Sequence, residues 1–98
     1  MKKLLTTALF AAFAAGGANA ADDVTLQLKW VTQAQFAGYY VAKAKGFYDE
    51  ESLNVTILPG GPDMAPTQVI TGGGAEVVLD SVPAAPAARE KGRPLVNI

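Results

Sequence analysis

The residues best suited to bind a small molecule lie in one short stretch, at positions 30–40. This stretch supplies an indole, two amides and a phenol, from Trp30, Gln33, Gln35 and Tyr39. Aromatic rings can stack on a planar ligand or enclose a cation, and a primary amide both donates and accepts hydrogen bonds. The pattern therefore predicts a site for a small molecule, either a planar ligand or a cation, with a purely structural role as the alternative for Trp30, Gln33 and Tyr39. For Phe36 and Tyr40, packing of a helix against a sheet is the favoured interpretation.

Two further stretches offer polar groups at loop positions. In Pro-Gly-Gly-Pro-Asp at 59–63, the backbone N–H groups around Gly61 could face an anion, although a plain turn is the alternative. Asp80 and Ser81 could bind an amine or hydroxyl of a ligand, or could instead cap the helix that follows. Neither stretch matches a phosphate-loop pattern, and Ser81 does not stand in a nucleophile elbow.

Histidine and cysteine are both absent from the 98 residues. These absences remove the usual zinc ligands, the usual general base and any disulfide framework. Serine–histidine and cysteine nucleophile systems cannot be assembled from this set of side chains. We therefore expect a protein that is not an enzyme, with no catalytic residues, no metal and no cofactor.

The elements that must position these side chains alternate along the chain. Alternating or β-branched apolar residues predict strands at 24–30, 53–58, 75–79 and 95–98. Helical spacing predicts helices at 36–45 with Gly46 as the stop, from Asp63 or Pro66 to Thr71, and at 83–91. Pro86 would remove a backbone bond from the last helix unless that helix begins late. Residues 47–52 are expected to form a short connector.

This alternation predicts an α/β fold with a partial, open, mostly parallel sheet and right-handed crossovers. In such sheets ligands bind outside the carboxyl ends of the strands. The rule selects the loops at 30–39, 59–63 and 80–83. The chain stops on an apolar strand, so we also expect the sheet to be incomplete.

The first twenty residues have the pattern of a secretory signal peptide. A basic start at 1–3 precedes an apolar run at 4–15 and an Ala-Asn-Ala site, with cleavage expected after Ala20. The apolar run is shorter than the roughly 20 residues of a spanning helix, and residue 21 is not cysteine. We expect a periplasmic protein that is not membrane-spanning after cleavage. The remaining residues carry a net charge of about −3 without a basic patch, which argues against nucleic acid as a partner.

Six stretches form a combined pattern: LKW at 28–30, QFAGYYVA at 35–42, KGFY at 45–48, LNV at 53–55, PGGPD at 59–63 and AREKG at 88–92. Together they resemble the periplasmic solute-binding proteins of the thiamine-pyrimidine-precursor family, which is related to receptors for nitrate, taurine and alkanesulfonates. The resemblance covers nearly all of residues 24–98, and no single stretch of it is specific.

The resemblance implies a two-lobed type II binding-protein fold that closes on its ligand and delivers it to the permease of an ABC importer. It implies that the loop at 30–39 contributes to the cleft, and that Asp80 and Ser81 lie at the cleft edge. The implied ligand is a planar heterocycle such as a thiamine pyrimidine precursor, with sulfonates, nitrate and riboflavin-like compounds as alternatives. The expected ligand-binding residues are Trp30, Gln33, Gln35, Tyr39, Gly61, Asp80 and Ser81.

Family receptors are much longer than this chain, so residues 21–98 are expected to form an incomplete first lobe. Two alternatives to the receptor stay open. The family also includes a pyrimidine biosynthetic enzyme that consumes its own histidine and uses cysteines, neither of which occurs here. The third interpretation is a gene fragment without a function of its own, which would expose an apolar sheet edge and dissolve poorly.

Overall fold

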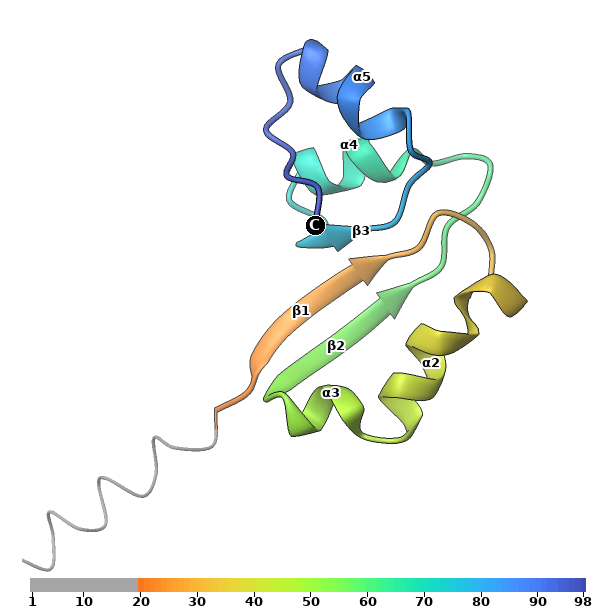
Figure 1. Ribbon diagram of the computed structural model, residues 1–98, viewed down its shortest axis with the longest axis vertical. Coiled ribbons are helices and arrows are strands. Elements are labelled where there is room, and N and C mark those ends of the chain that lie inside the picture. Colours follow the sequence, from red (N-terminus) through yellow and green to blue (C-terminus); the bar gives the residue numbers. More distant parts are fainter. Residues whose placement is uncertain (1–19) are drawn as a thin grey trace, which may run out of the picture.

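A computed structural model describes residues 20–98 (Figure 1). The predicted signal peptide, apart from Ala20, lies outside the described residues. In chain order the elements are β1 (Asp22–Gln27), the 3-10 helix η1 (Ala34–Phe36), α2 (Ala37–Ala44), α3 (Phe47–Glu50), β2 (Leu53–Leu58), α4 (Pro66–Thr71), β3 (Val77–Val78) and α5 (Ala84–Glu90). No helix in this part of the chain is both long and apolar enough to cross a membrane.

The three strands form one open parallel sheet in the order β2-β1-β3. β1 and β2 pair over six positions, from Asp22 opposite Leu53 to Gln27 opposite Leu58. The pairing of β1 with β3 is much shorter, with Leu26 opposite Val77 and Gln27 opposite Val78. The predicted α/β class with an open, parallel sheet is confirmed.

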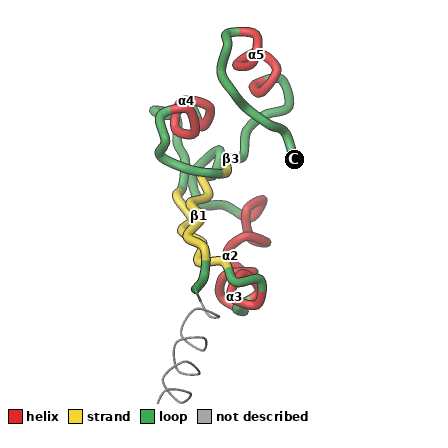
Figure 2. The backbone as a smooth tube through the Cα atoms, turned by 90° about the vertical axis from the view of Figure 1, so that its left-hand side faces the viewer, coloured by secondary structure: helices red, strands yellow, loops and turns green. Residues whose placement is uncertain are grey.

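The helices lie on both faces of this sheet. β2 and β3 flank β1 on opposite sides, so two right-handed crossovers must pass over opposite faces. Figure 2 shows this arrangement, with α2 and α3 on one side of the strands and α4 on the other. Strand β1 is therefore covered on both faces at its carboxyl end, where Leu26 and Gln27 are both buried.

The hydrophobic core is centred on β1, β2 and the helices that follow β1. Its buried members are Leu26, Leu28, Phe36 and Val55, and Leu28 has no exposed surface. Burial of such large apolar side chains contributes about 1.5–3 kcal/mol each. Phe36 lies in this cluster and Tyr40 packs against it, so the core interpretation of these two aromatic residues is confirmed.

Several boundaries differ from the predicted ones. β1 ends at Gln27 instead of residue 30: the Leu28 N–H still donates to the Leu58 carbonyl at 2.8 Å, and the chain then bends over residues 29–32. The supposed connector at 47–52 begins with the short helix α3. β3 has two residues instead of five.

The helix boundaries resolve the open choices of the sequence. α4 begins at Pro66 with Ala65 as its N-cap, so Asp63 does not cap it. α5 begins late, at Ala84, which places Pro86 in the first turn where no backbone bond is lost. Gly46 follows α2 with a φ of 77°, the left-handed conformation expected of a helix stop.

The predicted fourth strand at 95–98 is wrong. The chain there is irregular, and only Leu95 is buried while Val96 and Ile98 are 87% and 100% exposed. The physical reason is local hydrogen bonding. The Arg93 N–H donates to the Ala88 carbonyl and the Leu95 N–H donates to the Arg93 carbonyl, so these donors do not extend a ladder beside β3.

Candidate functional site

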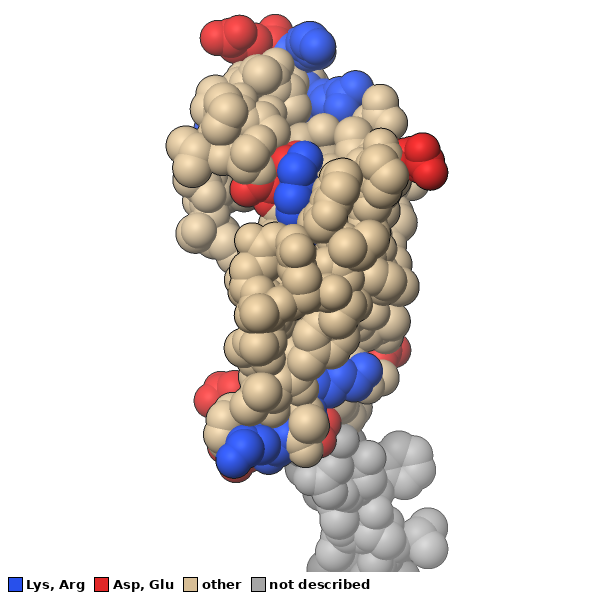
Figure 3. Space-filling view, turned by 90° about the vertical axis from the view of Figure 1, so that its right-hand side faces the viewer, with Lys and Arg blue, Asp and Glu red and all other residues tan. Residues whose placement is uncertain are grey.

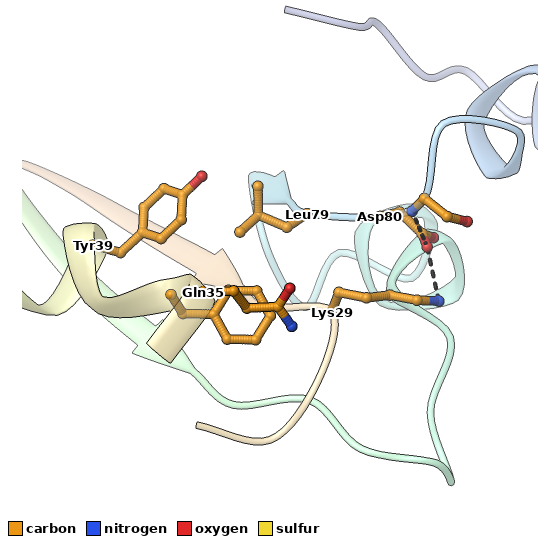
Figure 4. Close-up of a pocket in the computed structure, with 7 residues that line it drawn as sticks. Lys29, Gln35, Tyr39, Leu79 and Asp80 are labelled. Atoms are coloured by element: carbon orange, nitrogen blue, oxygen red, sulfur yellow. Dashed lines mark hydrogen bonds and ion pairs between the residues drawn. The ribbon is translucent and has the colours of Figure 1, made fainter. Parts of the chain in front are cut away.

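A hollow of about 360 Å³ opens at the carboxyl ends of β1 and β3 (Figure 4). Four predicted ligand residues line it: Gln35, Tyr39, Asp80 and Ser81. Lys29, Phe36 and Leu79 complete the lining. The loop after β1, the first turns of η1 and α2, and the loop after β3 thus meet at one place.

The strand order explains why the hollow lies there. From β1 the chain crosses one face of the sheet to β2, and from β2 it crosses the other face to β3. The loop that leaves β1 leads into the crossover over one face, and the loop that leaves β3 leads to α5, which packs against α4 of the crossover over the other face. A crevice opens between these two loops. This is the topological switch point at which open α/β sheets bind their ligands.

An ion pair spans this switch point. Lys29 Nζ lies 2.9 Å from Asp80 Oδ1, with the Asp80 side chain 10% exposed and the Lys29 side chain 45% exposed. The β1–β3 register accounts for the meeting: extended two positions beyond Gln27 and Val78, it sets Lys29 opposite Asp80. The Leu79 N–H, which donates to the Gln27 carbonyl at 2.9 Å, holds the two strand ends together.

Asp80 and Ser81 do not cap α5, so the capping alternative is wrong. The N-cap of α5 is Pro83, and no side chain bonds to the free N–H groups of this helix. Asp80 Oδ1 instead accepts from the backbone N–H of Ser81 at 2.8 Å as well as from Lys29. Figure 4 shows the Lys29 side chain extended toward Asp80, with Gln35 and Tyr39 on the side of the view away from Asp80.

The aromatic wall of the hollow is shared with the core. Tyr39 is half-buried, packs against the core and lines the hollow. Burial raises the pKa of the Tyr48 phenol above its ordinary value, and the nearby Tyr39 phenol adds to this increase because two phenolates would repel. Tyr40 contributes differently: its hydroxyl lies 2.9 Å from the Thr32 hydroxyl and ties the loop after β1 to α2.

Three predicted ligand residues do not line the hollow: Trp30, Gln33 and Gly61. Trp30 is 40% exposed, and its backbone carbonyl accepts from the Gly60 N–H at 2.9 Å. Gln33 is exposed at the N-cap of η1. The loops that carry them adjoin the hollow, and their contact with a ligand stays a prediction.

The loop after β2 is fixed to the loop after β1 by a buried amide. Gln27 is 2% exposed, and its Nε2 donates to the carbonyl oxygens of Leu28, Leu58 and Pro59 at 3.0–3.1 Å. Gly60 approaches so closely that an added Cβ would lie 2.5 Å from the Leu28 carbonyl oxygen. Gln27 thereby positions the backbone on which Lys29 stands.

Sequence reasoning missed Lys29 and Gln27. Both are polar residues that alternate with leucines along β1 and just beyond its end. Such an alternating pattern assigns the polar positions to a solvent-exposed face. Gln27 is buried because β1 is the central strand, and Lys29 meets Asp80 because of the β1–β3 register. Neither the strand order nor the register can be deduced from alternation alone.

Charge on the face seen in Figure 3 gathers toward its two ends, with a mixed basic and acidic spot and a separate acidic group in the upper part, and the middle of the face is uncharged. Within residues 20–98 no cluster of three metal-ligating side chains occurs. The hollow itself holds one cation and one carboxylate, already paired, together with an amide, a phenol and a hydroxyl. Such a lining suits hydrogen bonding to a small polar molecule.

Comparison with known proteins adds one match. A family model described as NMT1/THI5 like matches residues 33–98, which include Gln35, Tyr39, Asp80 and Ser81. No curated protein and no solved structure matches the chain.

Proposed function

The chain belongs to the NMT1/THI5-like family, whose members resemble solute-binding proteins, and from this premise we propose that it captures a small planar heterocycle for an ABC importer. The observation that carries the proposal is the hollow at the β1–β3 switch point. Four of the predicted ligand residues meet there, at the place where open α/β sheets bind ligands.

The lining of the hollow supports a planar, polar ligand. Tyr39 and Phe36 offer ring surface, while Gln35, Ser81 and Asp80 offer hydrogen-bonding groups. The volume of about 360 Å³ lies at the small end of the range for ligand pockets. These features fit a heterocycle of one ring, and a thiamine pyrimidine precursor is the ligand that we propose.

Predicted ligand residues that do not line the hollow would contact the ligand when a second lobe closes over it. Trp30, Gln33 and Gly61 stand on the loops that border the hollow, where a second lobe would close over the ligand. In this proposal residues 21–98 contribute an incomplete first lobe, and the ligand is delivered to a membrane permease. A signal peptide at 1–20, cleaved after Ala20, would place the receptor in the periplasm.

We propose binding without turnover. The 98 residues contain no histidine and no cysteine, and the one amine and the one carboxylate of the hollow neutralise each other. Mass spectrometry of the bound ligand after long incubation should therefore recover it unchanged. A modified ligand would favour the biosynthetic alternative.

The test is calorimetry on the protein expressed from its complete reading frame. The panel consists of aminopyrimidines, alkanesulfonates, nitrate and flavin precursors. We expect saturable binding of an aminopyrimidine, and weaker binding by the Trp30→Ala variant. Failure of every panel member to bind would contradict the receptor function, and an unchanged Kd for Trp30→Ala would remove Trp30 from the site.

A further inference from the structure

The ion pair between Lys29 and Asp80 bears on which ligands the hollow accepts. Its two members come from the loops after β1 and β3 and meet across the switch point at 2.9 Å. Both line the hollow, together with the uncharged side chains of Gln35, Tyr39 and Ser81. The lining therefore carries no net formal charge, although one member of the pair is far more enclosed than the other.

Asp80 is the enclosed member and still has capacity to accept hydrogen bonds. Its bonds within residues 20–98 go to Oδ1, from Lys29 Nζ and from the Ser81 N–H. No fully enclosed side-chain oxygen in this part of the chain lacks a partner, so Oδ2 retains accessible surface, and Asp80 is one of the residues that line the hollow. A carboxylate oxygen in this position accepts an N–H donor from a ligand without disturbing Lys29.

An anionic ligand meets a different situation. Its natural partner in the hollow is the Lys29 ammonium, whose charge is already balanced by the Asp80 carboxylate. Drawing Lys29 away would leave a carboxylate that is nine-tenths buried without its cation, and an unpaired buried charge is strongly unfavourable. Leaving Lys29 in place would set the anion beside the Asp80 charge.

We propose that the Lys29–Asp80 pair makes this hollow select neutral ligands that carry an N–H donor and reject anions such as nitrate and sulfonates. Asp80 Oδ2 accepts the ligand N–H, and Lys29 acts as a specificity residue by neutralising Asp80 instead of binding the ligand. The inference rests on the proposed function, because it concerns the same hollow, and it narrows the panel of candidate ligands to one class.

The test uses four probes at neutral pH on the protein from its complete reading frame: 4-aminopyrimidine, 4-methylpyrimidine, nitrate and ethanesulfonate. The two pyrimidines differ in the N–H donor and are similar in size. We expect 4-aminopyrimidine to bind at least about tenfold more tightly than each of the other three, since a charge-assisted hydrogen bond is worth a factor of this order.

Asp80→Asn is the decisive variant. The substitution preserves shape and an oxygen for the Ser81 N–H, but it frees the Lys29 charge. Nitrate and ethanesulfonate should then bind at least about tenfold more tightly than to the wild-type protein. The double variant Lys29→Met/Asp80→Asn should lose that gain. Asp49→Asn alters an exposed carboxylate on α3 away from the hollow, so it should leave the affinity for nitrate and for ethanesulfonate unchanged.

Lys29→Met is the mirror variant and keeps the test decisive if Asp80→Asn does not fold. It leaves Asp80 unpaired, so the planar cation benzamidinium should bind at least about tenfold more tightly than to the wild-type protein. Lys45→Met, at an exposed position after α2, is its matched control.

The outcomes separate this inference from the proposed function. Wild-type protein that binds nitrate or ethanesulfonate as tightly as 4-aminopyrimidine would overturn the inference and leave the receptor function standing. The inference would also be overturned, with the receptor function left standing, if neither Asp80→Asn nor Lys29→Met changed the affinity for the charged probes. Binding of no panel member by the wild-type protein would overturn both.

Discussion

Residues 22–58 and residues 66–98 build the same sheet with very different side chains. The first part holds the six-position β1–β2 ladder and all four members of the core cluster. In the second part the two-residue strand β3 is accompanied by the buried residues Pro66, Ala75, Ala88 and Leu95. Because a buried alanine or proline removes less apolar surface from water than a leucine or phenylalanine, burial stabilises the first part more.

The difference matters for the site, which lies between the two parts. Lys29, Gln35 and Tyr39 stand on the well-packed part, whereas Asp80 and Ser81 follow the short strand β3. Segments with few buried apolar contacts open at lower free energy than the core. We therefore expect the Asp80 side of the hollow to adapt to a ligand and the Tyr39 side to be preformed.

The largest expected effect tests where the stability of the molecule lies. Leu28→Ala removes a side chain with no exposed surface from the core, and Leu95→Ala removes the same groups from the second part, where Leu95 is 9% exposed. We expect Leu28→Ala to lower the free energy of unfolding by about 2–5 kcal/mol, and Leu95→Ala to cost clearly less. Urea denaturation followed by circular dichroism measures both. Equal losses would refute the asymmetry.

A second prediction concerns the contact between the loops after β1 and β2. A Cβ on Gly60 would lie 2.5–2.7 Å from backbone atoms of Leu28 and Lys29, whereas a Cβ on Gly61 meets nothing within 4 Å. Backbone atoms cannot move aside as a side chain can, so Gly60→Ala should cost about 1–3 kcal/mol. Gly61→Ala is the matched control and should leave the thermal midpoint nearly unchanged. Similar midpoints for the two variants would show that these loops are not in tight contact.

A third prediction separates the buried amide from the apolar core around it. Gln27→Met keeps the length of the side chain but leaves the carbonyl oxygens of Leu28, Leu58 and Pro59 without its two N–H groups. The expected cost is about 1.5 kcal/mol. Gln68→Met, at an exposed position in α4, should be neutral. If Gln27→Met matches the wild-type protein in urea, the amide is not what fixes the loop after β2.

The sequence predicts residues 22–58 better than residues 66–98. The reason is again the difference in apolar packing between the two parts. Strand 53–58 is found at its observed bounds because alternation is strong where one face packs on a core. The segment at 95–98 has β-branched residues but pairs with no strand of residues 20–98, so its apolar pattern does not become a strand. Local propensity cannot show whether a partner strand is in place.

The candidate site follows a similar division. Gln35, Tyr39, Asp80 and Ser81 could be predicted because each follows the carboxyl end of a predicted parallel strand, and topology brings such loops together. Lys29 could not, because its partner is set by the β1–β3 register. Asp80 looks like a helix cap in sequence, and only the late start of α5 shows that its carboxylate is directed elsewhere.

The smallest predicted effect is a pH dependence within the first part. Burial, with a smaller contribution from Tyr39, raises the pKa of Tyr48 in the folded protein above its ordinary value of 10.0. Well below pH 10 the phenol is neutral in both the folded and the unfolded protein, so its ionisation does not affect the free energy of unfolding. As the pH rises through the folded pKa, the unfolded chain has already released this proton, so the free energy of unfolding falls.

Tyr48→Phe removes this ionisation and keeps the ring that packs against the core. Lysines and the other tyrosines titrate in the same range, so the informative quantity is the difference between the two proteins. We expect the wild-type protein to lose more stability than the variant between about pH 9 and pH 11, as measured by urea denaturation at each pH. Parallel curves would mean that the Tyr48 hydroxyl is as well solvated in the folded protein as in the unfolded chain, and that the packing of the first part does not extend to this side chain.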